Sequence, residues 1–264
     1  AEHVHRTNSD VPEDIIQGLA EIGAFGLSVP EEYGGWGSGG ESEYIGMVVA
    51  TEELSRGSLG AGGSLITRPE ILTRALVKGG TEEQKQEWLP ALATATKLGC
   101  FGLTEPGTGS DAGNLTSRAA RDGSDWVIDG RKLFITNGTW ADVALVFART
   151  GGPGPKGISA FLVPTDSKGF EATEIKGKLG MRGQATAEIT LDDVEVPHDA
   201  LLSEEGFKLA MGALDKGRMS VAAGCVGAAR GALEAALEYA KEREQFGKPI
   251  AGFQLVQELL ADMA

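Results

Sequence analysis

Cysteine and histidine are scarce in this chain of 264 residues, which contains two cysteines and three histidines. Cys100 and Cys225 lie far apart with no Cys-x-x-Cys spacing, so the sequence predicts neither a disulfide framework nor a zinc site. The histidines show no metal-ligand spacing either. We therefore expect no metal and a reducing compartment.

Positive charge is also in deficit, because 24 lysines and arginines stand against 38 aspartates and glutamates, for a formal net charge of -14. Such an acidic balance argues against a nucleic-acid partner or an anionic membrane surface. No apolar run approaches the roughly 18 residues of a membrane span, and no charged and then apolar leader opens the sequence. We expect a soluble protein, in which local arginines, backbone amides and helix N-termini could still hold an anion.

Three regions follow one another along the chain, and a hydrophobic content of 41% is enough for a substantial core. Helix starts and apolar residues at three-to-four spacing mark residues 1–97, including a capping-box pattern at Thr81. Alternating β-rich runs mark residues 98–205, and alanine and leucine return at helical spacing over 206–264. We predict an α+β fold with an N-terminal helical domain, a middle antiparallel β-barrel or sandwich domain, and a C-terminal helical bundle.

The two ends of the chain are unusual for a complete protein. Ala1 stands where a chain normally begins with Met, and the apolar helical pattern of residues 253–263 runs on to Ala264. A helix seldom stops without a cap. We therefore expect a part of a longer protein, with the C-terminal bundle incomplete.

The segment most suited to a ligand is 104–111, which reads Thr-Glu-Pro-Gly-Thr-Gly-Ser-Asp and follows a strand-like run. Its glycines, hydroxyls and exposed backbone amides suit an anion or the edge of a heterocycle. An ordinary turn between strands is the alternative, since the same residue types dominate turns for steric reasons. A Rossmann site is not indicated, because no strand, Gly-x-Gly-x-x-Gly and helix follow one another.

The run Gly-Leu-Thr-Glu-Pro-Gly-Thr-Gly-Ser-Asp at 102–111 resembles a signature of the acyl-CoA dehydrogenase family. Six further blocks resemble the family and occur in its order: 30–35, 51–56, 80–85, 130–138, 193–197 and 243–250. The resemblance covers nearly the whole chain. It implies the family's fold, in which a helical domain, a β domain and a helical bundle follow one another and FAD lies between the last two.

The resemblance also implies flavin contacts for particular residues. Phe101, Leu103 and Thr104 are expected to touch the isoalloxazine ring, whose other side Phe134 and Thr136 would cover, with Thr136 near N5. Gly109 belongs to the cofactor-binding loop, and Ser110 should lie where flavin and CoA meet. Two departures from the family's usual residues are mild: Phe134 replaces a frequent Trp but keeps an aromatic face, and Thr108 replaces a smaller residue.

Residues of the last region complete the implied site. Arg243, Gln245, Phe246 and Gln254 match positions that hold the FAD of a neighbouring subunit, which implies a homo-oligomer, as a dimer of dimers or homotetramer. Without the resemblance, Arg243 belongs to a charge-rich helix end of the kind that usually faces solvent.

The pair Asp215 and Arg218 matches positions beside the CoA or acyl thioester. Its alternative reading is a helix cap followed by an exposed arginine. Arg68 falls at the acyl end of the implied pocket, where a cation would suit an acyl chain ending in carboxylate, as in the branches that act on methylsuccinyl-CoA or glutaryl-CoA. The alternative is a structural arginine paired with Glu70 or Glu53.

The resemblance implies FAD-dependent α,β-dehydrogenation of an acyl-CoA to the trans-2-enoyl-CoA, in fatty acid metabolism, with an electron-transfer flavoprotein as acceptor. A bacterial cytoplasm or a mitochondrial matrix would suit it. We expect no catalytic residue in this chain: most branches carry the basic Glu on a later helix, beyond Ala264 here, and the minority position before Arg218 is Gly217. Two alternatives stay open, an acyl-CoA oxidase-like or nitroalkane oxidase-like flavoenzyme, and a non-catalytic FAD- or acyl-CoA-binding subunit of a heteromeric assembly.

Overall fold

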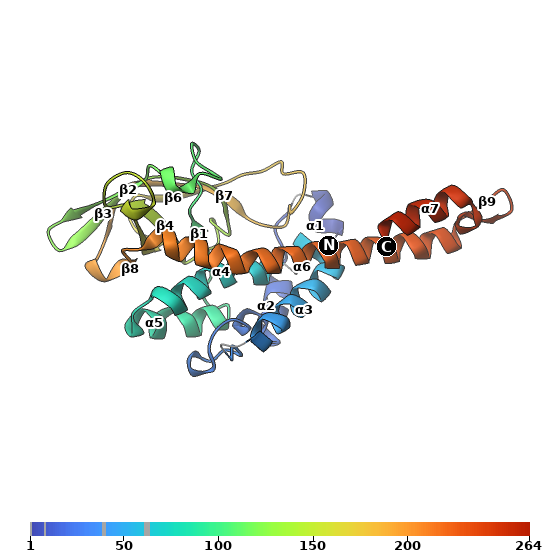
Figure 1. Ribbon diagram of the computed structural model, residues 1–264, viewed down its shortest axis with the longest axis horizontal. Helices are drawn as coiled ribbons and strands as arrows, with labels where there is room; N and C mark the ends of the chain where they lie inside the picture. Colours follow the sequence, from blue (N-terminus) through green and yellow to red (C-terminus); the bar gives the residue numbers. More distant parts are fainter. Residues whose placement is uncertain (1, 8, 39–40, 61–63) are drawn as a thin grey trace.

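The computed structural model describes residues 2–7, 9–38, 41–60 and 64–264, without the side chains of residues 2, 41–42 and 64–69. Helices form both ends of the chain and strands form its middle (Figure 1). The N-terminal helices are α1 (Glu2–Thr7), α2 (Glu13–Glu21), α3 (Glu41–Ser58), α4 (Ser64–Gly79) and α5 (Glu82–Ala93). The predicted capping box is present: the Thr81 hydroxyl accepts from the Gln84 N–H, and the Gln84 side chain accepts from the Thr81 N–H.

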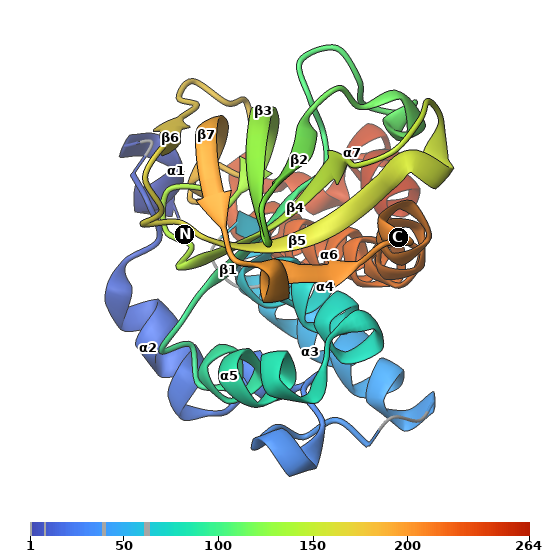
Figure 2. The same cartoon turned by 90° about the vertical axis from the view of Figure 1, so that its left-hand side faces the viewer.

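Eight strands form the middle region in one sheet, in the order β6-β7-β3-β2-β4-β5-β8, with β1 beside β4. Their bounds are β1 (Gly99–Gly102), β2 (Arg118–Asp122), β3 (Asp125–Thr136), β4 (Val143–Arg149), β5 (Ile158–Pro164), β6 (Phe170–Glu174), β7 (Thr186–Val196) and β8 (Leu201–Ser203). The helices α3, α4 and α5 lie beneath these strands (Figure 2).

The sheet corrects the prediction of a β-barrel. Its two end strands, β6 and β8, do not pair with each other in the described chain, so the sheet is not closed. Most pairings are antiparallel as predicted, but β1 and β2 both pair with β4 in parallel, and β2 meets β4 through the single register pair Arg118 and Arg149. The alternating pattern indicates that a segment is a strand, whereas the direction of its neighbour depends on contacts between segments far apart in the sequence.

Strand β4 separates two hydrophobic cores. Val143, Leu145 and Phe147 point to the helices, where they belong to one cluster with Leu72 and Leu76 of α4. The alternate residues Ala144, Val146 and Ala148 belong to a second cluster on the other face of the strand. Burial on both faces explains why residues 143–148 are continuously apolar, and it anchors the sheet on the helices.

The long helix α6 (Gly206–Glu242) packs first on α4 and the sheet and then along α3. Glycines allow the close approach to α3, since a Cβ added at Gly227 would lie 2.0 Å from the Glu52 carbonyl oxygen. Beyond α3 the helix projects from the body of the molecule and turns through β9 (Glu244–Gln245) and β10 (Lys248–Pro249) into α7 (Gln254–Met263), which runs back beside it (Figure 1). Within the described ranges, no helix has the length and apolar character needed to cross a membrane.

Candidate functional site

A cavity of about 270 Å³ opens where the end of β1, the end of β3, α4 and α6 meet. It is lined by Ile71, Cys100, Phe101, Leu103, Thr104, Gly109, Ser110, Ala112, Phe134, Ile135, Thr136, Met211, Leu214 and Arg218. The structure therefore brings together every flavin-contact residue predicted in the middle region, and it adds Arg218. Ile71, Met211 and Leu214 were not predicted, and they supply an apolar wall from the helices.

Phe134 owes its position to an irregularity in β3. The register of β3 against β7 shifts between Lys132 and Ile135, and Phe134 has a φ of 59° in the left-handed region. A bulky residue rarely adopts that conformation, which therefore marks a strained segment of the kind that gathers at binding sites. The bulge leaves the Phe134 side chain 64% exposed at the cavity. Strand periodicity gave no signal of this bulge.

The loop 104–111 presents polar groups that lack partners. The backbones of Glu105 and Thr108 bond to each other in both directions, at 3.0 and 3.1 Å, which closes a tight turn. The buried Thr108 hydroxyl has no hydrogen-bond partner. Within the described part of the chain, the N–H groups of Gly109 and Ser110 also lack partners, and both residues line the cavity. Unpaired donors at the cavity suit the polar edge of a ligand.

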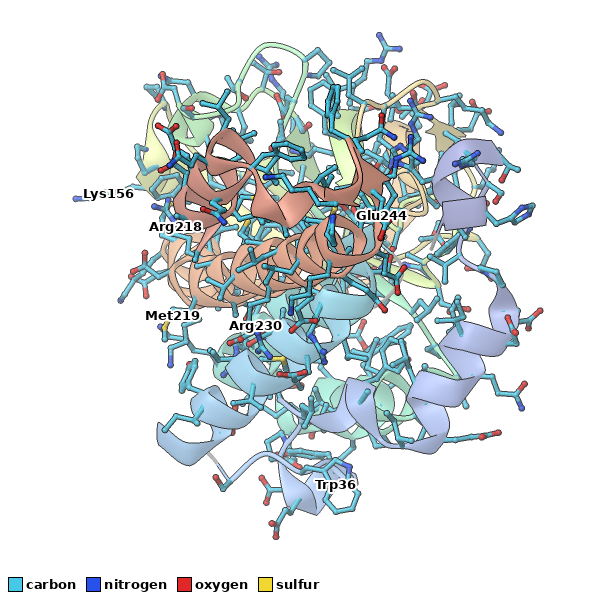
Figure 3. The ribbon with its side chains drawn as sticks, turned by 90° about the vertical axis from the view of Figure 1, so that its right-hand side faces the viewer. Trp36, Lys156, Arg218, Met219, Arg230 and Glu244 are labelled. Carbon is cyan, nitrogen blue, oxygen red and sulfur yellow. The ribbon has the colours of Figure 1, made fainter. Side chains whose placement is uncertain are left out.

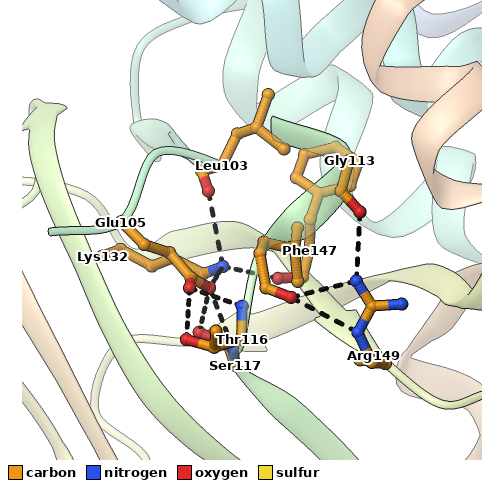
Figure 4. Close-up of polar contacts among 9 residues, drawn as sticks. Leu103, Glu105, Gly113, Thr116, Ser117, Lys132, Phe147 and Arg149 are labelled. Atoms are coloured by element: carbon orange, nitrogen blue, oxygen red, sulfur yellow. Dashed lines mark hydrogen bonds and ion pairs between the residues drawn. The ribbon is translucent and has the colours of Figure 1, made fainter. Parts of the chain in front are cut away.

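Behind this loop lies a buried ion pair between Glu105 and Lys132 (Figure 4). The Glu105 carboxylate accepts bonds of 2.6 to 2.9 Å from the N–H and the hydroxyl of both Thr116 and Ser117. The Lys132 Nζ lies 2.8 Å from the carboxylate and 2.6 Å from the Phe147 carbonyl oxygen that accepts from it. Lys132 is 0% exposed and Glu105 4%, so both charges are removed from water.

The surroundings of this pair shift both pKa values. Burial raises the pKa of Glu105, but the Lys132 charge and the hydrogen bonds to the carboxylate outweigh burial and bring that pKa to about 2. Burial lowers the pKa of Lys132 to about 8, although Glu105 raises it. Our sequence reasoning missed Lys132 as a site residue. Its signal is alternation, because Lys132 follows Ile128 by four residues on the same face of the strand.

Only one of the two residues Asp215 and Arg218 lines the cavity. Arg218 projects from α6 (Figure 3) and lines the cavity, whereas Asp215 is exposed and does not line it. The alternative reading of Asp215 as a helix cap is wrong, because α6 begins at Gly206, more than two turns earlier. Leucine and alanine between Gly206 and Asp215 favour helix, so the helix begins well before Asp215, the residue that the sequence offered as its cap.

Arg243, Gln245, Phe246 and Gln254 lie at the far end of α6 and the start of α7, and all four are exposed. Between Arg218 and Arg243 the helix rises by roughly 37 Å at its usual 1.5 Å per residue. These residues are therefore remote from the cavity of their own chain (Figure 1).

Arg68 lies in α4, but its side chain lies outside the described residues. Both carboxylates that the sequence offers as its partners have other cations. Glu70 pairs with Arg74 and accepts from the Ser220 hydroxyl, and Glu53 pairs with Arg56 and Arg230.

Known protein families match all three regions of this chain. Family models for the N-terminal, middle and C-terminal domains of acyl-CoA dehydrogenases match residues 1–96, 100–194 and 204–264. A probable acyl-CoA dehydrogenase of Bacillus subtilis is 46% identical over 268 residues, which cover 100% of this chain and 69% of that protein. This chain belongs to the acyl-CoA dehydrogenase family.

Other members of the acyl-CoA dehydrogenase family agree in sequence and in structure. The human mitochondrial short-chain specific enzyme is 40% identical over 96% of this chain and 61% of its own length. The butyryl-CoA dehydrogenase structure from Megasphaera elsdenii has a TM-score of 0.92 at 38% identity, over 99% of this chain and 69% of that one. A glutaryl-CoA dehydrogenase from Mycobacterium smegmatis, in complex with FADH2, has a TM-score of 0.89 at 39% identity, over 99% and 65%. The chain thus spans between 61% and 69% of the length of these relatives.

Proposed function

We propose that this chain forms the flavin- and thioester-binding part of an FAD-dependent acyl-CoA dehydrogenase, which converts an acyl-CoA to the trans-2-enoyl-CoA. The observation that carries the proposal is the convergence of loop 104–111, Phe134 and Thr136, and Arg218 on one cavity. The related glutaryl-CoA dehydrogenase that holds FADH2 supports the choice of cofactor.

The residues at the cavity fit a flavin. Phe101 and Leu103 offer an apolar wall, Phe134 offers an exposed aromatic face, and Gly109 and Ser110 offer unpaired N–H donors to a polar ring edge. Bound FAD would supply the acceptor for the hydride that leaves the β carbon of the acyl chain. Thr136, at the end of β3, is the residue we place nearest the reactive edge of the ring.

The α proton of the thioester requires a base, and the described cavity does not supply one. Among the described residues that line it, none is Asp or Glu. Glu105 is a poor candidate, because its carboxylate is occupied by five hydrogen bonds and its pKa of about 2 makes it a weak base. Position 217 is a glycine whose added Cβ would lie 3.2 Å from Ile71. We infer that the base comes from outside the described residues.

We further propose that Arg243, Gln245, Phe246 and Gln254 hold the FAD of a second copy of this chain. Their exposure and their distance from the cavity of their own chain support a contact between subunits. The planar Arg243 guanidinium suits a pyrophosphate, with which it can form paired charge-assisted hydrogen bonds. The assembly would be a dimer of dimers.

Electron-transfer flavoprotein is the proposed acceptor of the electrons. A subunit of the caffeyl-CoA reductase-Etf complex of Acetobacterium woodii is 41% identical over 97% of this chain and 68% of its own length. The proposed substrate is a short acyl-CoA, in line with relatives named as short-chain specific and butyryl-CoA dehydrogenases. A terminal carboxylate on that substrate would be bound by Arg68, with Asp215 and Arg218 near the CoA.

Anaerobic addition of butyryl-CoA or glutaryl-CoA tests this function in two FAD-loaded samples. One is the natural protein, as its gene encodes it, and the other is the 264-residue chain alone. We expect the natural protein to lose its flavin colour and to recover it quickly only when electron-transfer flavoprotein is added. The isolated chain should bind FAD but bleach far more slowly if the base lies elsewhere. Rapid recovery of colour in air would replace the proposal with an oxidase, and bound FAD that no acyl-CoA bleaches would replace it with a non-catalytic subunit.

Arg68→Ala separates a carboxylate clamp from a structural arginine. We expect a larger loss with glutaryl-CoA than with butyryl-CoA, because only the first substrate carries a second carboxylate. The matched control is Arg131→Ala, an exposed arginine of β3 that pairs with Glu188. Equal losses on the two substrates would rule out the clamp.

A further inference from the structure

The buried pair of Glu105 and Lys132 stands directly behind the two segments that would hold the flavin. Glu105 follows Thr104, and Lys132 precedes Phe134 by two residues, while Thr104 and Phe134 both line the cavity. These two segments are far apart in the sequence. What joins them fixes the distance between the two sides of the proposed flavin site.

Hydrogen bonds and one ion pair connect the two segments. The Leu133 N–H donates to the Thr104 carbonyl oxygen at 2.8 Å. The Lys132 ammonium bonds Glu105 at 2.8 Å and reaches the Leu103 carbonyl oxygen at 3.5 Å. It also donates to the carbonyl of Phe147 on β4, so that one cation binds the loop and the neighbouring strand at once (Figure 4).

Stability alone is a weak reason for such a pair. Two charges buried together are often no more stabilising than apolar residues of the same size, because removing them from water costs about as much as their attraction returns. They do select one geometry, since each donor and acceptor of this network must find its partner. Either residue alone would place a full charge close to the proposed flavin, whereas the two together have no net charge.

We propose that Glu105 and Lys132 are positioning residues for the flavin, which hold loop 104–111 in register with residues 132–136 and keep the space behind the ring electrically neutral. This inference rests on the proposed function. It makes two separable claims. The bonds of the pair position the loop, and the balance of its charges sets the electrostatic environment of the flavin.

Two variants separate these claims. In Lys132→Met the Glu105 carboxylate keeps its four donors from Thr116 and Ser117 but loses the charge that lowers its pKa most, so the site gains a net negative charge in buffer alkaline enough to ionise Glu105. The double variant Glu105→Gln with Lys132→Met removes both charges and the connection between them. The matched controls are Arg131→Met and Arg131→Met with Glu188→Gln, which alter an exposed ion pair beginning at the adjacent residue.

The experiment measures the dissociation constant of FAD and the midpoint potential of the bound flavin for natural protein and variants, with circular dichroism to verify folding. In Lys132→Met we expect FAD to bind roughly tenfold more weakly or worse, and a more negative potential, because an unbalanced carboxylate opposes electrons entering the ring. In the double variant the potential should return toward the natural value while FAD remains weakly bound. The controls should change neither quantity.

Several results would overturn the inference. Variants that keep the natural affinity and potential would show that the pair does not position the flavin. A potential that shifts equally in the single and double variants would show loosening without a role for charge balance. If Lys132→Met fails to fold, the double variant still tests whether the bonds of the pair position the loop. A double variant that binds FAD as tightly as the natural protein would refute that claim. Natural protein that holds no FAD would instead refute the proposed function itself.

Discussion

Acid sensitivity of the fold should depend on Glu105 more than on an ordinary surface carboxylate. Its pKa is lowered from the usual 4.5 to about 2, so its ionised form stabilises the folded state above pH 4.5 and that contribution is lost as pH falls through about 2. A shift of this size corresponds to about 3 kcal/mol, at about 1.4 kcal/mol per pKa unit. Lys132, with a pKa of about 8, stays protonated over this whole range and does not contribute to the change.

Urea unfolding measured at several pH values below neutrality tests the figure. Between pH 4.5 and 2, the natural protein should lose about 3 kcal/mol more unfolding free energy than the variant with Glu105→Gln and Lys132→Met. The exposed pair variant, Arg131→Met with Glu188→Gln, should follow the natural protein, because exposed ion pairs contribute little. Parallel curves for the natural protein and the buried-pair variant would refute the reasoning.

Two further predictions concern α6 and Arg243, the residue that follows it. Gly227→Ala should destabilise the protein by about 3 kcal/mol in urea unfolding, since the new Cβ would lie 2.0 Å from the Glu52 carbonyl oxygen. The control Gly18→Ala, whose Cβ would have nothing within 4 Å, should be neutral or up to about 1 kcal/mol more stable. Similar unfolding midpoints for the two variants would contradict the tight contact of α3 and α6. Arg243→Ala should weaken FAD binding roughly tenfold and disturb subunit association in sedimentation, and Lys241→Ala, an exposed cation two residues earlier, should do neither; equal effects would assign the loss to general charge.

The types of the elements could be predicted from spacing, because the period of apolar residues differs between helix and strand. The β-rich runs of the middle region are strands as predicted, although the burial of residues 143–148 on both faces was not predicted, and the capping box at Thr81 is present in the structure. The parallel pairing of β1 with β4 could not be predicted, because strand direction depends on the path of the chain between distant segments. The barrel prediction was wrong for the same reason, because the sequence of a single strand does not show whether its sheet closes.

The candidate site was predicted through family motifs rather than through periodicity. Motifs placed Thr104, Phe134 and Thr136 at one ligand, and the structure gathers them at one cavity. The left-handed Phe134 at a register shift gave no sequence signal, because a bulge depends on the partner strand. Lys132 had a signal that went unused: a lysine on the inward face of a strand requires a buried anion, and Glu105 is that anion.

Equilibrium binding of FAD to the natural protein and to Phe134→Ala tests the central claim most directly. Phe134 is 64% exposed at the cavity, so its truncation removes a contact surface for the ring without opening a hole in either core. Leu179→Ala is the control, since Leu179 is 93% exposed and does not line the cavity. We predict that the natural protein and Leu179→Ala bind FAD alike and that Phe134→Ala binds it roughly tenfold more weakly or worse. Absence of FAD binding by the natural protein, or equal binding by Phe134→Ala, would contradict the account.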